Sequence, residues 1–232
     1  MPDARLTDDS AIWIIVPAYN EAARIGKTLA PLCRAFPNIV VIDDGSSDDT
    51  AAIAAKSPVW LLQHMINSGQ GAALQTGIDF ALKHGAGIIV TFDADGQHDA
   101  GDVLRLVEPI RRGEVDVVLG SRFLGKTIDM PWTRHVMLKG AVWFTRFFSQ
   151  IAVTDTHNGF RALSRQAAQT IRITQNRMAH ASEILDQIRE YQLRYCEAPV
   201  TIRYNVATLE KGQSNSAAVK IAAQFLLGRL VR

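Results

Sequence analysis

Three aspartates and a histidine lie close together in the segment TFDADGQHD, residues 91–99. Asp93 and Asp95 have the spacing Asp-x-Asp, which offers two oxygen ligands from one turn, and Gln97 could supply a third. Oxygen ligands suit Mg²⁺ or Mn²⁺, whereas zinc prefers histidine and cysteine. The segment therefore has two interpretations: a metal site, or an acidic turn that only keeps a loop in water.

The chain around this segment alternates between apolar strands and helices. Five apolar runs are predicted to be strands: 11–16, 38–43, 59–64, 87–93 and 115–122. Continuous apolar runs are typical of strands covered on both faces, as in parallel sheets. Helical segments of about 10–15 residues separate them, which indicates successive βα units. We therefore predict an α/β fold with a mostly parallel sheet flanked by helices.

Candidate ligand-binding residues follow four of these predicted strands. They are Pro17, Tyr19 and Glu21, then Asp43 and Asp44, then Asp93 and Asp95, and finally Ser121 and Arg122. Ligands of parallel α/β sheets bind beyond the carboxyl ends of the strands. A solvated turn is polar as well, but four such ends, with carboxylates at two of them, favour a binding site.

Asp43 and Asp44 end the second predicted strand. A carboxylate there can accept a hydrogen bond from a base N–H or a ribose hydroxyl. The alternative is that the acidic turn caps the next helix. Asp48 and Asp49 are predicted to cap that helix, because negative charge suits a helix N-terminus, and this leaves the first pair nearer the ligand.

Two glycines mark the segment SGQGAAL, residues 68–74. It has neither the third glycine of a dinucleotide fingerprint nor the Gly-Lys-Ser/Thr of a P-loop. We interpret Gly69 and Gly71 as a tight turn that lets backbone approach a ligand.

The composition is that of one globular domain of 232 residues, with 47% hydrophobic and 21% charged residues. The formal net charge of +2 is too small for bulk electrostatic binding, so no nucleic-acid partner is expected. Cys33 and Cys196 are expected to be free thiols in a reducing compartment. The N-terminus lacks the apolar segment of a secretory signal, and no run of about 18 apolar residues predicts a membrane-spanning helix.

Two later segments could lie on a membrane surface. Residues 128–153 mix tryptophan and phenylalanine with arginine and lysine, and the tail 217–232 places polar residues every fourth position among apolar ones. Such segments can rest on a bilayer with the apolar face down and the cations at the headgroups. The alternatives are ordinary core-packing helices, or an oligomer contact for the tail.

Six motifs together identify a family. They are IIVPAYNEAARI, VVIDDGSSDDT, NSGQGAALQTGI, VTFDADGQHDAGDV, VVLGSRFLG and DTHNGFRALSR. In this order, over about residues 11–205, they resemble family 2 glycosyltransferases, and within that family the dolichyl- and polyprenyl-phosphate sugar synthases. The resemblance implies a GT-A fold with a mixed central sheet and a Rossmann-like nucleotide-binding half. It also implies a nucleoside diphosphate sugar donor, a divalent metal (Mg²⁺ or Mn²⁺) and inversion at the anomeric carbon.

The resemblance also implies site residues and a division of the single domain. The nucleotide-sugar-binding half would span 11–125, the acceptor half 126–216, and an amphipathic tail 217–232. The implied nucleotide-binding residues are Pro17, Tyr19, Glu21, Ile42, Asp43, Asp44, Gly71, Asp93 and Ala94, and the implied metal ligands are Asp93, Asp95 and Gln97. Arg122, Arg161, Arg203 and Lys211 would hold the acceptor phosphate as cations, with Arg122 also counted as catalytic.

Asp155 is the position expected for a catalytic base. A phosphate acceptor is already anionic near neutral pH, so Asp155 would then only position Arg161.

Two departures from the family pattern concern phosphate contacts. Gln70 stands where the family usually has lysine, and the late segment LEKGQSNS matches the family's basic glycine motif only in part, with Lys211 just before the glycine.

The predicted function is transfer of a sugar from a UDP- or GDP-sugar to a polyprenyl phosphate. The predicted place is the cytoplasm, peripheral at the cytoplasmic face of a membrane, and a separate membrane partner protein is possible in principle. Transfer to a glycan or soluble hydroxyl is the alternative within the class, and Asp155 would then act as a true base. A sugar nucleotidyltransferase would want a glycine-rich loop where this chain has PAYNEAARI, and a non-catalytic binding module would not need Asp93 and Asp95.

Overall fold

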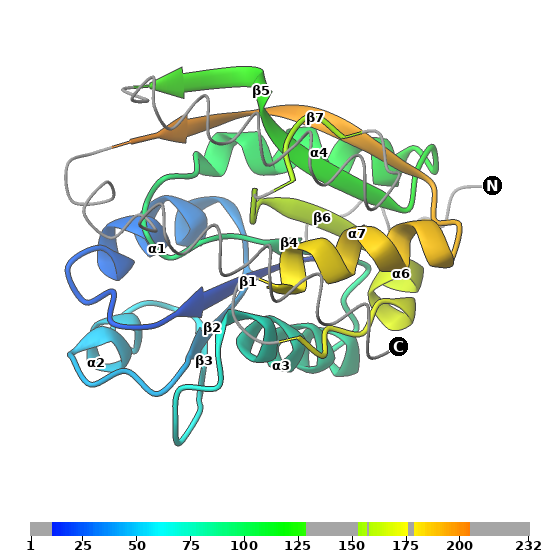
Figure 1. Ribbon diagram of the computed structural model, residues 1–232. Helices are drawn as coiled ribbons and strands as arrows, with labels where there is room; N and C mark the ends of the chain where they lie inside the picture. Colours follow the sequence, from blue (N-terminus) through cyan, green and yellow to red (C-terminus); the bar gives the residue numbers. More distant parts are fainter. Residues whose placement is uncertain (1–10, 129–152, 157, 176–178, 205–232) are drawn as a thin grey trace, which may run out of the picture.

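One mixed sheet forms the centre of the molecule (Figure 1). The computed structural model describes residues 11–128, 153–156, 158–175 and 179–204. In this part of the chain the sheet has seven strands in the order β3-β2-β1-β4-β6-β5-β7. The strands are β1 (Ile12–Ala18), β2 (Asn38–Asp43), β3 (Trp60–Gln63), β4 (Ile88–Thr91), β5 (Val117–Ile128), β6 (Arg161–Ser164) and β7 (Tyr195–Arg203).

Helices follow the strands as the alternating pattern predicts. They are α1 (Ile25–Ala35), α2 (Thr50–Ala54), α3 (Gln70–Lys83), α4 (Val103–Arg111), α6 (Arg165–Thr170) and α7 (His180–Glu190), with a short 3₁₀ helix η3 (Ala100–Asp102) before α4. Strands β1, β2, β3 and β4 are parallel to one another, as are β5 and β7. Only β6 runs antiparallel, to β4 on one side and β5 on the other. The prediction of a mostly parallel, mixed sheet is therefore confirmed.

Alternation along β1 separates two apolar cores. Ile12 and Ile14 face one core together with apolar residues of α1 and α4, whereas Trp13 and Ile15 face the other with residues of α3, α6 and α7. Figure 1 shows these two groups of helices on opposite sides of the sheet. β1 is therefore buried on both faces, which explains its continuous apolar sequence.

Strands β5 and β7 extend together past the shorter β6 (Figure 1). Their pairing runs from Val117↔Tyr195 to Ile128↔Arg203, with an irregularity between Ser121 and Lys126. Position 125 needs a glycine, because a Cβ atom there would lie only 2.1 Å from the carbonyl oxygen of Val200. β5 also crosses the predicted division at 125/126, so one sheet contains strands from both halves.

The register brings the carboxyl ends of β4 and β5 to the same edge of the sheet. Thr91 pairs with Arg161, and Arg161 pairs with Leu119. Asp93 and Arg122 therefore lie just beyond one row of the sheet, although they are far apart in sequence. None of the helices in the described part of the chain has the length and apolarity needed to cross a bilayer. The segments 128–153 and 217–232, predicted to rest on a membrane, lie almost entirely outside the described residues.

Candidate active site

The loop after β4 fixes Asp93 more tightly than Asp95. Asp93 Oδ1 accepts a hydrogen bond from Gln70 Nε2 at 3.0 Å, and its Oδ2 lies 2.9 Å from His98 Nε2. A Cβ atom on Gly159 would lie 2.6 Å from Asp93 Oδ2, so only glycine allows this close approach. Asp95 Oδ1 accepts one hydrogen bond, from the backbone N–H of Gln97 at 3.0 Å. Asp95 thus retains more capacity to bind a cation.

The two carboxylates differ in pKa because their surroundings differ. Burial raises the pKa of Asp95 to about 6, and the negative charge of Asp93 adds to this effect. Burial acts the same way on Asp93, but the hydrogen bond and positive charge of His98, with the charges of His180 and Arg161, keep its pKa below the ordinary value. Two carboxylates that repel each other in a partly buried loop form a site that a cation would stabilise.

The described residues include no group of three histidine, cysteine or acidic side chains arranged to hold a metal. Two carboxylates are enough for Mg²⁺ or Mn²⁺ when the phosphates of a substrate complete the coordination. Asp93, Asp95 and the partly exposed Gln97 come from one loop, as predicted, and their oxygen donors fit such an ion.

The same loop is attached to the free edge of β7. Arg203 N donates to the carbonyl oxygen of Gln97 at 2.9 Å, and Thr201 N donates to Asp102 Oδ2 at 2.7 Å. Arg203 Nη2 also lies 3.0 Å from Asp99 Oδ2. Arg203 was predicted to hold the acceptor phosphate; the structure places it in β7 and in contact with the loop that follows β4.

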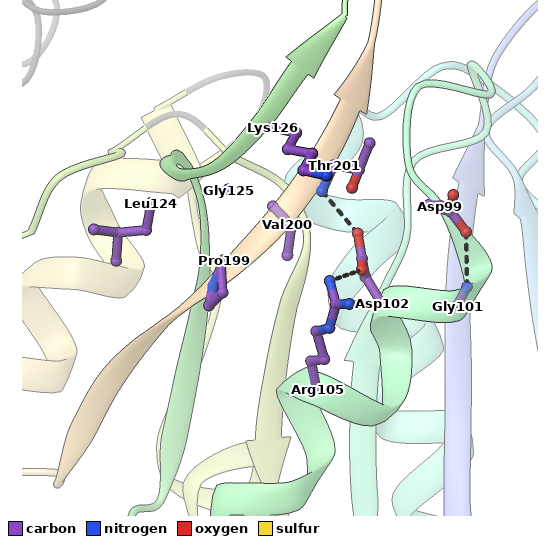
Figure 2. Close-up of a pocket in the computed structure, with 10 residues that line it drawn as sticks. All are labelled: Asp99, Gly101, Asp102, Arg105, Leu124, Gly125, Lys126, Pro199, Val200 and Thr201. Carbon is purple, nitrogen blue, oxygen red and sulfur yellow. Dashed lines mark hydrogen bonds and ion pairs between the residues drawn. The ribbon is translucent and has the colours of Figure 1, made fainter.

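A cavity of about 460 Å³ lies beside this attachment (Figure 2). Its wall includes Asp102, which binds both Arg105 and the backbone N–H of Thr201, and Leu124 and Lys126 from β5. None of the predicted site residues lines it. Because its carboxylates already bind protein groups, we regard this cavity as part of the loop's attachment and not as the donor site.

Asp43 and Asp44 have different environments despite being neighbours. Asp44 accepts hydrogen bonds from the backbone N–H groups of Ser68 and Gly69, at 2.9 and 2.7 Å, and its Oδ1 lies 2.7 Å from His64 Nδ1. Asp43 Oδ1 is buried and has no hydrogen-bond partner among the described residues. Buried polar atoms are rarely left unpaired, so Asp43 is the better candidate to bind a ligand group, and Asp44 holds the loop before α3.

The end of β1 and the β1–α1 loop carry three more of the predicted nucleotide-binding residues. Pro17 lies in β1, and the side chain of Tyr19 is 46% exposed just after that strand. Glu21 binds Arg24 at 2.7 Å, and its backbone N–H donates to Thr50 at 2.8 Å. An exposed aromatic ring beside a strand end is available to stack on a base.

The acidic turn after β2 supports this loop as well as the next helix. Asp48 Oδ1 accepts a hydrogen bond from Thr50 N, in agreement with the predicted capping, while its Oδ2 accepts one from Ala22 N of the β1–α1 loop. Asp49 occupies the N-cap position of α2, but its side chain makes no capping hydrogen bond.

Three predicted nucleotide-binding residues have structural roles that the sequence did not indicate. The Ile42 side chain is fully buried beneath Gly77 of α3, so only its backbone could face a ligand. A Cβ atom on Gly71 would lie 2.2 Å from the carbonyl oxygen of Gln175, so packing of the chain requires this glycine. Ala94 is buried, and its carbonyl oxygen accepts a hydrogen bond from Thr28 of α1 at 3.0 Å.

A buried ion pair joins Arg122 of β5 to Asp155 of the segment 153–156. Arg122 Nε lies 2.6 Å from Asp155 Oδ2, the Arg122 backbone N–H donates to the same oxygen at 3.1 Å, and Nη1 donates to Tyr204 Oη at 2.7 Å. Asp155, expected to position Arg161, binds Arg122, and its charge also acts on Arg161. Burial lowers the pKa of Arg161 to about 10, against the opposing charges of Asp93 and Asp155.

Some functional residues were missed or lie outside the described part. Tyr204 contacts Arg122 and Glu197 contacts Thr154, and sequence patterns gave no sign of either, because each acts across the sheet and not within a local motif. His98, the histidine of the segment 91–99, lies in the turn with its Nε2 atom 2.9 Å from Asp93 Oδ2. Lys211, predicted to bind the acceptor phosphate, lies outside the described residues.

The fold is of the GT-A type: a mixed α/β sheet with an Asp-x-Asp loop at the carboxyl ends of its strands. The model of glycosyl transferase family 2 matches residues 13–172. The chain belongs to this family.

Named relatives agree with this assignment. A UDP-N-acetylglucosamine–dolichyl-phosphate N-acetylglucosaminyltransferase of Methanococcus voltae is 30% identical, covering 94% of this chain and 96% of the relative. A polyprenol monophosphomannose synthase of Mycolicibacterium smegmatis is 32% identical, over 68% of this chain and 63% of the relative. In structure, the chain is similar to glucosyl-3-phosphoglycerate synthase of Mycobacterium tuberculosis, solved with Mn²⁺ and UDP-glucose, with TM-score 0.70, 19% identity, and 99% and 84% coverage.

Proposed function

We propose that this glycosyltransferase moves a sugar, with inversion, from a nucleoside diphosphate sugar to a polyprenyl phosphate. The observation that carries this choice of acceptor is the Asp155–Arg122 ion pair. A catalytic base must be free to take a proton from its substrate. Asp155 Oδ2 already accepts two hydrogen bonds from Arg122, so Asp155 is poorly placed for that role. A phosphate monoester is anionic near neutral pH and needs no such base.

The donor would bind at the carboxyl edge of β1, β2 and β4. Asp43 would accept a hydrogen bond from the base or ribose, and the exposed ring of Tyr19 would stack on the base. Asp93, Asp95 and Gln97 would hold Mg²⁺ or Mn²⁺, which when bound offsets the charge that develops on the leaving diphosphate. The raised pKa of Asp95 supports this, because its charge lacks an adequate protein partner.

Arg161 is the best placed of the predicted acceptor-phosphate cations. It is buried, and its charge acts on both Asp93 and Asp155, so it lies between the two sides of the site. Its single hydrogen-bond acceptor within the described residues is the carbonyl oxygen of Asn158, at 3.1 Å, so part of the guanidinium remains for a ligand. Arg203 is engaged by Asp99, and we assign it the lesser role.

The names of the two curated relatives support a lipid phosphate acceptor. Such an acceptor lies in a membrane, so we propose that the enzyme works at a membrane surface, with the cytoplasmic face and a separate partner protein as further parts of the proposal. Binding measurements with each nucleotide and each metal would distinguish UDP from GDP and Mg²⁺ from Mn²⁺.

Two experiments test this function. A thermal-shift panel of UDP, GDP, CDP and ADP, with and without Mn²⁺, is expected to show one nucleotide that stabilises the protein only with the metal. Nucleoside diphosphate sugars of that nucleotide, radiolabelled in the sugar, are then supplied together with a polyprenyl phosphate. The expected product is a labelled lipid that partitions into organic solvent. Label that appears only on a soluble hydroxyl acceptor would favour the alternative acceptor class. Nucleotide binding without transfer to either acceptor would indicate a binding module.

A further inference from the structure

Residues 153–156 carry Asp155 to the acceptor side without belonging to a helix or a strand. Helices and strands hold their backbone by regular hydrogen bonds, so an irregular segment needs other partners to keep a side chain in place. Three hydrogen bonds to this segment converge on one atom of β7. Glu197 Oε1 accepts from Thr154 N at 2.8 Å, from Thr154 Oγ1 at 2.8 Å and from Asp155 N at 3.2 Å.

We propose that Glu197 is a positioning residue for transfer, acting through Asp155 and Arg122. This rests on the proposed function, which it deepens. Glu197 pairs in register with Leu119 of β5, three residues before Arg122. The strand that presents Arg122 and the segment that presents Asp155 are therefore fixed to the same point of β7.

A second contact supports the same arrangement. Ser121 Oγ and Thr154 Oγ1 are 2.6 Å apart, so the residue before Arg122 binds the residue before Asp155. Thr154 thus connects Ser121 with Glu197. Arg122 directly follows Ser121 in the chain, and Asp155 directly follows Thr154. A carboxylate that accepts three hydrogen bonds is a strong anchor, because bonds to a charged acceptor are about twice as strong as neutral ones.

The chemical reason for such an anchor is precision. A displacement of about 1 Å in a positioning group can cost about 100-fold in rate. Without Glu197, the segment 153–156 would lose three of its hydrogen bonds, and the Asp155 carboxylate would shift on Arg122. The acceptor phosphate would then meet a displaced guanidinium, while the donor side, built on Asp43, Asp93 and Asp95, would stay as it is.

The first test compares Glu197→Gln with Glu190→Gln. Glu190 is exposed at the end of α7, so its variant removes the same charge without touching the site. We expect Glu197→Gln to lower kcat for transfer by about 10-fold or more, since a neutral amide is a weaker acceptor. The donor KM and the metal-dependent thermal shift are expected to stay within about 2-fold of the wild type. Glu190→Gln should match the wild type throughout.

The second test measures the anchor without relying on catalysis. Hydrogen exchange at the amides of Thr154 and Asp155 is expected to be about 10-fold faster in Glu197→Gln than in Glu190→Gln, because the neutral side-chain amide of glutamine is a weaker acceptor for these two N–H groups than the carboxylate. Thr154→Val removes one of the three hydrogen bonds and is expected to give a smaller change of the same kind. If Glu197→Gln does not fold, the exchange measurement on Thr154→Val tests the anchor in its place.

A double-mutant cycle with Asp155→Asn shows whether Glu197 acts through Asp155. We expect the two substitutions together to lower kcat little more than Asp155→Asn alone. Full additivity, unchanged exchange at Thr154 and Asp155, or an equal loss of nucleotide binding and transfer would each overturn the proposal. A wild-type protein that transfers no sugar would overturn the proposed function and with it the catalytic role, while the exchange measurement would still decide whether Glu197 anchors the segment.

Discussion

The carboxylate of Asp155 and the guanidinium of Arg122 form an ion pair that is almost completely buried, with Nε 2.6 Å from Oδ2. Tyr204 adds a hydrogen bond to the same guanidinium at 2.7 Å. Burial makes such a pair sensitive to the loss of one partner, because the remaining charge stays in a poorly solvated place. The pair therefore has a structural role that can be separated from its proposed role in transfer.

Replacing Arg122 with methionine is expected to cost about 3–5 kcal/mol in the free energy of unfolding, because the Asp155 carboxylate stays buried without the guanidinium that forms its ion pair. Urea unfolding at neutral pH measures this. Arg172→Met is the control, since Arg172 pairs with Asp79 on the surface and such pairs contribute about 1 kcal/mol or less. Similar losses in the two variants would contradict the prediction.

In the metal-free protein, the Asp95 carboxylate lowers the free energy of unfolding by an amount that depends on pH. Its pKa is raised in the folded state from an ordinary 3.8 to about 6, so the folded chain binds more protons than the unfolded chain between these values. Stability therefore falls as pH rises through this window, and the cost is fully present above pH 6. Asp95→Asn is expected to raise the free energy of unfolding by on the order of 2 kcal/mol at neutral pH.

The check is thermal unfolding in chelator at several pH values. The gain from Asp95→Asn should disappear below about pH 4, where the carboxyl is protonated in both states. The same variant should lose the metal-dependent nucleotide shift. A gain that is equally large at low pH would mean that the carboxylate charge is not its cause.

Substitution by asparagine is expected to affect stability at Asp44 and nucleotide binding at Asp43. Asp44→Asn should lower the free energy of unfolding by about 1–3 kcal/mol, because its carboxylate accepts hydrogen bonds from Ser68 and Gly69. Asp43→Asn should leave stability nearly unchanged and weaken nucleotide binding by about 10- to 100-fold, since Asp43 Oδ1 has no partner in the described part of the chain. Calorimetric titration and thermal unfolding measure the two effects; nucleotide affinity that survives in Asp43→Asn would count against its assignment.

Gly71→Ala is expected to cost about 1–3 kcal/mol, because the new Cβ atom would lie 2.2 Å from the Gln175 carbonyl oxygen. Gly26→Ala is the matched control within α1. Its Cβ atom would meet Ile53 at an ordinary 3.4 Å, so alanine should stabilise the helix by about 0.5–1 kcal/mol. Chemical unfolding of both variants compares them directly. Equal effects would mean that the segment at Gln175 moves aside.

The fold could be predicted from sequence because its signals are local. Each of β1, β2 and β4 is a continuous apolar run followed by turn residues, and this is the pattern of a strand buried on both faces. Strand β6 was not predicted, because its four residues RALS have no periodicity and its antiparallel place depends on both neighbours. Strand β5 runs beyond its predicted end because β7 pairs with it there.

The candidate site could be predicted where residue types and spacing suffice, as for Asp93 and Asp95. The sequence could not distinguish Asp43 from Asp44, since the difference lies in the fold of the loop at 64–69. Nor could it connect Asp155 with Arg122, 33 positions away, or with Glu197, 42 positions away. These contacts depend on the order of strands in the sheet, which no local pattern contains.

Strand β7 ends the sheet, and an uncovered edge strand invites pairing with another chain. The backbone N–H groups of Thr201 and Arg203 at this edge are occupied by Asp102 and Gln97 of the loop that carries Asp95. Displacing that loop would therefore also uncover an aggregation-prone edge. It follows that a ligand that holds the loop should protect the protein against self-association, and the purified enzyme should keep its solubility longest in buffers that contain the donor nucleotide and its metal.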